Sequence, residues 1–242
     1  YQQHGAHAEL SLLISESPIT AIQHIINSGA QLDIDAEEAN RLADLLLSYV
    51  QPIPASITTV NRDAYAALSA LLPTNETFRE RHEFYTAASI ERAQSLRSQL
   101  RVEVDEFSGV RRFYHPDQPR YADSRSYVSV YLQSGHSGLR PVFRAHYNSN
   151  SWLFVNSASA AVDSIVHRLD LSPWRRGNNS EIWEWATANV DEALFTTIRT
   201  ISASSRSVVR FRSVSEFDDI VISRSDKQVL HDMLLVHELG VE

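Results

Sequence analysis

Arginine, tyrosine and histidine residues alternate with apolar residues through the middle of this 242-residue chain. The side chains that we take as candidates for binding are Arg111, Arg112, Tyr114, Arg140, Arg144, His146, Trp174 and Arg175. Arginine binds carboxylates and phosphates through a planar fork of N–H donors, and arginine and aromatic residues dominate the binding energy of protein interfaces. This group therefore predicts a contact surface for a protein partner or for an acidic ligand. The plainer alternative is that tyrosine fits half-buried strands and arginine fits their solvent side.

Two histidines near the C-terminus, His231 and His237, raise the question of a metal site. A zinc-protease helix needs two histidines four residues apart on one face. A separation of six residues rotates the second histidine by about 600°, which leaves the two on opposite sides of a helix. We therefore expect no metal site here. The chain has only seven glycines and no phosphate- or dinucleotide-binding fingerprint, so we expect no cofactor either.

The Gly-His-Ser-Gly sequence at 135–138 is similar to the start of a nucleophile elbow, which has the pattern Gly-x-Ser-x-Gly between a strand and a helix. Position 139 is leucine and a strand pattern follows it, so we predict a hairpin turn instead. The chain has thirty Asp and Glu residues, but no spacing selects two of them as an acid–base pair. The sequence therefore assigns no catalytic residue.

Composition excludes several classes of protein. The chain contains no cysteine, which rules out disulfide bonds, thiolate nucleophiles and cysteine-based zinc sites. The formal net charge of −8 argues against nucleic-acid binding, although residues 97–160 contain eight arginines and only five acidic residues. No apolar run approaches the roughly 18 residues of a membrane-spanning helix. We expect a folded protein with no membrane span.

Residues 8–100 have the pattern of helices. Apolar residues recur at about one helical turn in four segments, at 17–29, 33–50, 59–72 and 76–100. Ser17 is a candidate cap of the first segment and precedes a proline, and Thr59 or Asn61 is a candidate cap of the third. Acidic residues begin the second segment, where they suit the positive end of a helix dipole. The sequence thus predicts a helical region over residues 1–100.

From residue 102 the pattern changes to strict alternation, which is typical of strands packed on one face. Two short strands flank a turn at 105–109, and further strands are expected at 127–132, 139–147, 152–155, 165–171, 181–186, 208–212 and 219–223. Two later helices are expected, at 190–201 and from Ser223 or Ser225 to residue 239. The predicted fold class is α+β, with an antiparallel sheet or sandwich and two helices over residues 101–242.

Alternation also assigns side chains to faces within 139–147. The residues expected to face a core are Leu139, Pro141, Phe143, Ala145 and Tyr147, and those expected on the other face are Arg140, Val142, Arg144 and His146. Three candidate binding residues should therefore share one side of a strand.

The hydrophobic and turn positions at 104–114, 152–155, 209–212 and 219–223 resemble a poorly characterised β-rich domain of bacterial exported proteins and lipoproteins. The resemblance covers roughly residues 100–240, implies a sandwich-like fold and an envelope location, and brings no catalytic residues. We therefore expect a non-enzymatic protein-binding or structural module of the bacterial envelope, exported or periplasmic. A cytoplasmic location is the alternative to export. The alternative function is a hydrolase with its site between the helical and β-rich parts.

Overall fold

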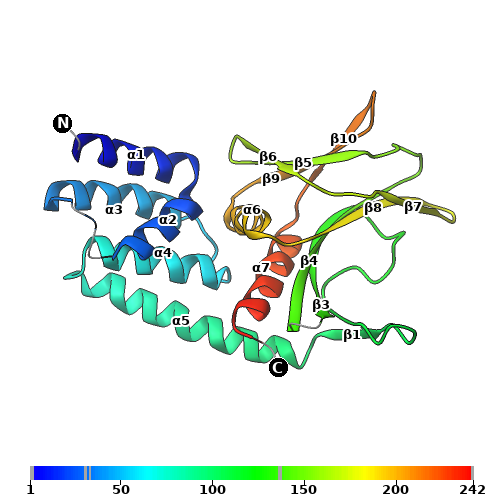
Figure 1. Ribbon diagram of the computed structural model, residues 1–242, viewed down its shortest axis with the longest axis horizontal. Coiled ribbons are helices and arrows are strands. Elements are labelled where there is room, and N and C mark those ends of the chain that lie inside the picture. Colours follow the sequence, from blue (N-terminus) through cyan, green and yellow to red (C-terminus); the bar gives the residue numbers. More distant parts are fainter. Residues whose placement is uncertain (1–2, 30–31, 33, 136–137, 241–242) are drawn as a thin grey trace. The chain divides into compact units, whose positions relative to one another are not determined.

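The structure is a computed structural model that describes residues 3–29, 32, 34–135 and 138–240 (Figure 1). Contacts within the chain divide it into two compact units, Tyr1–Glu91 and Arg92–Glu242. The sequence predicts a boundary near residue 100, whereas the contacts place it inside the last helix of the helical region. The class is α+β, as predicted.

The described part of the helical region has five helices rather than the four predicted: α1 (Gln3–Glu16), α2 (Pro18–Ser28), α3 (Ala36–Val50), α4 (Thr58–Leu71) and α5 (Glu76–Arg97). The apolar residues of α1 do not gather on one face, so the periodic pattern does not reveal it. Asp35 caps α3 by accepting a hydrogen bond from the Glu38 backbone N–H at 2.8 Å. Ser17 is the N-cap residue of α2 and precedes a proline, as predicted, although its side chain makes no capping hydrogen bond. The expected cap of α4 is wrong, because α4 begins at Thr58. Asp33 lies outside the described residues.

The second unit contains two antiparallel sheets. Their strands are β1 (Arg101–Val104), β2 (Arg111–Tyr114), β3 (Tyr127–Gly135), β4 (Gly138–Ser149), β5 (Ser157–Val162), β6 (Ile165–Leu169), β7 (Arg175–Asn178), β8 (Ile182–Asn189), β9 (Ser207–Arg212) and β10 (Phe217–Val221). The six-stranded sheet has the order β1-β2-β3-β4-β8-β7, and the four-stranded sheet has the order β10-β9-β5-β6. The two predicted later helices are confirmed as α6 (Glu192–Ala203) and α7 (Arg224–Glu238).

Both sheets share one hydrophobic core with α6 and α7. Phe143 of β4, Phe211 of β9 and Met233 of α7 are among its largest fully buried side chains. Helix α7 packs mainly on β3 and also contacts β4 (Figure 1). Ser223 caps α7 by accepting a hydrogen bond from the Asp226 backbone N–H at 3.0 Å, which confirms the predicted start of this helix. The six-stranded sheet therefore has an inner face on the core and an outer face.

The strand expected at 152–155 is wrong, because a buried carboxylate takes the hydrogen bonds that a strand would make. Glu184 is fully buried and accepts the backbone N–H groups of Leu153, Phe154 and Val155 at 2.8–3.0 Å. Arg176 donates to the same carboxylate at 2.9 Å and to the Val155 carbonyl at 3.1 Å. Phe154 consequently adopts a positive φ of 57°, which is incompatible with a strand.

None of the helices in the described part of the chain is both long and apolar enough to cross a membrane.

Candidate functional site

Cross-strand pairing brings six of the eight candidate residues to the outer face of the six-stranded sheet. Directly opposite residues of an antiparallel pair share a face. The register therefore places on this face Arg101, Glu103, Arg112, Tyr114, Tyr127, Ser129, Gln133, Arg140, Val142, Arg144, His146, Arg175, Trp185 and Thr187. The expected division of side chains along β4 agrees with this register, because Phe143, Ala145 and Tyr147 are buried in the core.

One end of the outer face is a polar row that crosses four strands. Glu103 is paired with Arg112, Arg112 with Gln133, and Gln133 with Arg140. Neighbouring strands lie about 4.8 Å apart, so each side chain of the row has the next one beside it. Arg140 is exposed, and Arg112 and Gln133 are half-buried.

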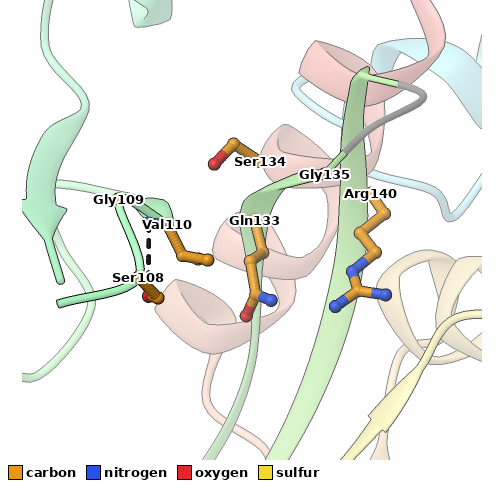
Figure 2. A pocket seen from close by; sticks show the side chains of 7 residues that line it. All are labelled: Ser108, Gly109, Val110, Gln133, Ser134, Gly135 and Arg140. Atoms are coloured by element: carbon orange, nitrogen blue, oxygen red, sulfur yellow. Dashed lines mark hydrogen bonds between the residues drawn. The ribbon is translucent and has the colours of Figure 1, made fainter.

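A pocket of about 640 Å³ opens at the end of this row (Figure 2). It is lined by the β1–β2 turn and the β3–β4 hairpin: Ser108, Gly109, Val110, Gln133, Ser134, Gly135 and Arg140. The side chains of Gln133 and Arg140 point the same way from neighbouring strands (Figure 2). The predicted hairpin is confirmed by the pairing of Gly135 with Gly138, while His136 and Ser137 lie outside the described residues.

The arginines of the outer face make no ion pair in the described part of the chain, although Glu103 is the cross-strand neighbour of Arg112. Arg112, Arg140, Arg144 and Arg175 each have no described carboxylate within 4.0 Å. Elsewhere in the second unit, Arg125 pairs with Asp226 at 2.6 Å. The four unpaired guanidinium groups on this face can therefore bind an external anion without breaking an internal ion pair.

The middle of the outer face is aromatic. Tyr114, Tyr131 and Val142 form a small buried cluster, and the Arg144 guanidinium lies 5.7 Å from the Tyr131 ring centroid. Burial, together with the negative charge of Glu103, raises the pKa of Tyr114 to about 12. The Arg144 guanidinium thus lies against a tyrosine ring at the edge of this aromatic cluster.

The other end of the outer face is buried, which separates His146 from the contact surface. Its ring stacks on Tyr127 with centroids 4.8 Å apart and faces Trp185 at 6.5 Å. The Nε2 atom lies 2.7 Å from the Ala122 carbonyl oxygen, so Nε2 donates that hydrogen bond. Burial and the positive charge of Arg144 lower the pKa of His146 to about 4. His146 is therefore a neutral packing residue, only 2% exposed.

Two candidates lie away from this surface. Trp174 packs against the core with its ring centroid 6.0 Å from that of Phe211. Arg111 has the opposite strand parity to Arg112, and its guanidinium lies 5.1 Å from the Phe113 ring. Sequence analysis also missed Gln133, which only the pairing of β3 with β2 and β4 brings between two arginines.

The histidine–carboxylate contacts that a hydrolase would need converge on Asp232, which is fully buried. One oxygen, Oδ1, lies 3.0 Å from His231 Nδ1 and accepts from Arg92 Nε and Gln228 Nε2 at 3.0 and 2.9 Å. The other carboxylate oxygen, Oδ2, accepts from Arg92 Nη2 at 2.5 Å and lies 3.1 Å from His115 Nε2.

Burial alone would raise the pKa of Asp232, but the hydrogen bonds from both histidines and Arg92 outweigh it and lower the pKa. Both oxygens of this carboxylate are occupied, so the cluster joins α5, the segment after β2, and α7 rather than offering an atom to a substrate. Within the described ranges, no group of three or more His, Asp or Glu side chains is placed to hold a metal ion.

Comparison with known proteins gives no further guidance: no protein-family model, no curated protein and no solved structure matches this chain. The geometry of the outer face is therefore the basis for a functional proposal.

Proposed function

We propose that this chain is a non-enzymatic binding module whose outer face binds an acidic segment of a protein partner. The observation that supports the proposal is that Arg112, Arg140, Arg144 and Arg175 share one sheet face and have no described carboxylate partner. A charge-assisted hydrogen bond between arginine and a carboxylate is about twice as strong as a neutral one. Acidic side chains of a partner would supply the missing counter-charges.

The spacing of the arginines suits an extended segment. Arg140 and Arg144 are four residues apart on β4, which separates them by roughly 13 Å along the strand. In an extended peptide, residues i and i+4 also point to one side and are separated by the same distance. An extended partner with glutamates at alternate positions could therefore contact both arginines at once.

The resemblance of residues 100–240 to exported β-rich domains leads us to propose the bacterial envelope as the location of this module. Fractionation of cells that produce the tagged full-length gene product tests this. Recovery with the envelope fractions is the expected result, and recovery with cytoplasmic markers would support the alternative location.

The binding proposal is tested with a fluorescent twelve-residue peptide that alternates glutamate and threonine, titrated with the full chain and followed by anisotropy. We expect binding that weakens between about 50 and 300 mM salt, because salt screens exposed charges. The double variant Arg140→Glu, Arg144→Glu should lower the affinity at least tenfold. The corresponding glutamine peptide should not bind.

A matched control is the double variant Arg168→Glu, Arg212→Glu, which changes the net charge equally on the outer face of the four-stranded sheet. Circular dichroism of both variants checks that they fold. The proposal is wrong if the Arg140 and Arg144 variant binds the peptide as well as the unmodified chain does, or if both double variants lose the same affinity.

A further inference from the structure

The pocket beside Arg140 has the features of a subsite for one carboxylate. We propose that it holds a single carboxylate of the acidic partner between the Arg140 guanidinium and the Gln133 amide (Figure 2). This inference rests on the proposed function, and it adds where the partner is anchored and by which chemical group.

Gln133 and Arg140 are arranged as one binding pair at the pocket. The two serines that line it, Ser108 and Ser134, instead accept backbone N–H groups through their hydroxyls. Gln133 and Arg140 are direct cross-strand partners, and their side chains point the same way (Figure 2). Among the described residues, neither side chain has a hydrogen-bond partner. A guanidinium offers five N–H donors and an amide offers two, so together they can surround both oxygens of a carboxylate.

The wall opposite this pair is preformed. Asp105 accepts hydrogen bonds from the backbone N–H groups of Phe107 and Ser108, each at 3.1 Å, and the Gly109 N–H donates to the Asp105 carbonyl at 2.7 Å. These backbone hydrogen bonds lower the pKa of Asp105, so its ionised carboxylate is engaged by backbone N–H groups of the turn. The turn holds Val110 against the pocket, where its side chain gives an apolar wall.

The electrostatics of the pocket favour an anion. Among the described residues that line it, Arg140 is the one that carries a charge, and Arg112 lies on the far side of Gln133 in the same row. The volume of about 640 Å³ falls within the range of small-ligand pockets and exceeds that of a carboxylate alone. It has room for a carboxylate with an aliphatic stem that packs on Val110. A glutamate side chain and the C-terminus of a peptide both provide such a group.

Two small probes distinguish these sources of the carboxylate. N-acetyl-glutamic acid amide presents only a side-chain carboxylate, and N-acetyl-valine presents only a terminal one. N-acetyl-glutamine amide is the neutral control. Each is titrated into the isotope-labelled full chain while the arginine Nε–Hε signals are followed by NMR. We expect a saturable shift of the Arg140 signal with at least one acidic probe and none with the neutral probe.

Variants locate the subsite. Arg140→Gln should weaken binding of the acidic probe at least tenfold, and Gln133→Ala should weaken it about threefold. Arg212→Gln is the matched control, since Arg212 is an exposed arginine of the four-stranded sheet with no described carboxylate partner, outside the pocket lining. It should leave the affinity of the probe unchanged.

The results separate this inference from the proposed function. If the alternating peptide binds but no carboxylate probe shifts Arg140, or if the Arg140 and Arg212 signals shift equally, the subsite is wrong and the proposed function stands. If the probes bind at Arg140 but the peptide does not bind the outer face, the proposed function is wrong and the subsite stands.

Discussion

The two sheets of the second unit both present arginines on the face away from the core, but two of the three on the four-stranded sheet pair with carboxylates, whereas Arg212 does not. On the four-stranded sheet, Arg210 makes two hydrogen bonds of 2.7 Å to Asp219, its direct partner on β10. Its guanidinium also lies 3.9 Å from the Phe217 ring centroid. Arg168 on the same face pairs with Asp170 at 2.8 Å. On the outer face of the six-stranded sheet, the corresponding arginines have no described carboxylate partner.

This difference shows that the number of arginines on a sheet does not identify a binding surface. A paired guanidinium must give up its internal carboxylate before it can bind another one, so little net free energy is gained. An unpaired guanidinium loses only its bound water molecules when it binds an external carboxylate. The same residue type therefore points to intramolecular neutralisation on one sheet and to an external anion on the other.

The two faces also differ in burial. The four-stranded sheet exposes an apolar row that includes Val166 and Val221, which are 69% and 61% exposed. On the six-stranded sheet, the segment between β2 and β3 contacts the outer face, where carbonyl groups of Gln118 and Ala122 bond to Arg101 and His146. One end of that face thus contributes to stability, and the other remains accessible for binding.

The largest expected effect compares an aromatic residue from each face. Tyr127 is 2% exposed and stacks on His146, so Tyr127→Ala should lower the free energy of unfolding by about 3–5 kcal/mol. Phe217 is 54% exposed, so Phe217→Ala should cost about 1 kcal/mol or less. Urea unfolding followed by circular dichroism measures both values. Equal losses would contradict the difference in burial between the two faces.

A smaller effect is expected from His146 as the pH falls. Its pKa is about 4 in the folded chain and about 6.5 when unfolded, so the unfolded chain takes up the proton first. The contribution of neutral His146 to the free energy of unfolding is therefore fully present above pH 6.5. It is lost as the pH falls towards 4, which lowers the free energy of unfolding by about 3 kcal/mol in total. His146→Gln removes this titration.

The measurement is urea unfolding of both proteins between pH 7.5 and pH 4. The carboxylates that titrate over this range are common to both, so their effects cancel in the difference between the two proteins. The free energy of unfolding of His146→Gln, relative to that of the unmodified chain, should rise by about 3 kcal/mol as the pH falls from 7.5 to 4. A difference that stays constant over the range would show that His146 is accessible to protons in the fold, like a surface histidine.

The sequence predicted which side chains of one strand share the outer face, but not which residues of the neighbouring strands lie beside them. Alternation is a local property, so the shared face of Arg140, Arg144 and His146 followed from positions in β4 alone. The neighbours of these residues depend on register, which joins Gln133 to Arg112 at a separation of 21 positions and is not encoded in either strand. The covering of His146 by Ala122 depends on the path of a connecting segment, which periodicity does not describe.

The same limit explains the error at 152–155. The apolar residues of this segment have the composition of a strand, and two of them are buried. Its backbone conformation is decided by Glu184, about thirty positions later in the chain, which binds three successive N–H groups. A single acidic residue within a predicted strand has no feature that identifies it as a buried acceptor.

The smallest expected effect is a test of the paired arginine on the four-stranded sheet. The Arg210 guanidinium holds the pKa of Asp219 below its usual range, and the charge of Arg212 adds to this. Arg210→Gln should therefore raise the pKa of Asp219, and Arg212→Gln should raise it less. Carbon-13 NMR of the Asp219 carboxyl during an acid titration measures both changes. Because the lowered pKa stabilises the folded chain while Asp219 is ionised, the unmodified chain should be slightly more stable than Arg210→Gln at neutral pH. This difference should disappear in acid, where Asp219 becomes protonated in both proteins. An Asp219 pKa that does not respond to Arg210→Gln would mean that the charge of Arg210 is not used within the sheet, and the contrast between the two outer faces would then be lost.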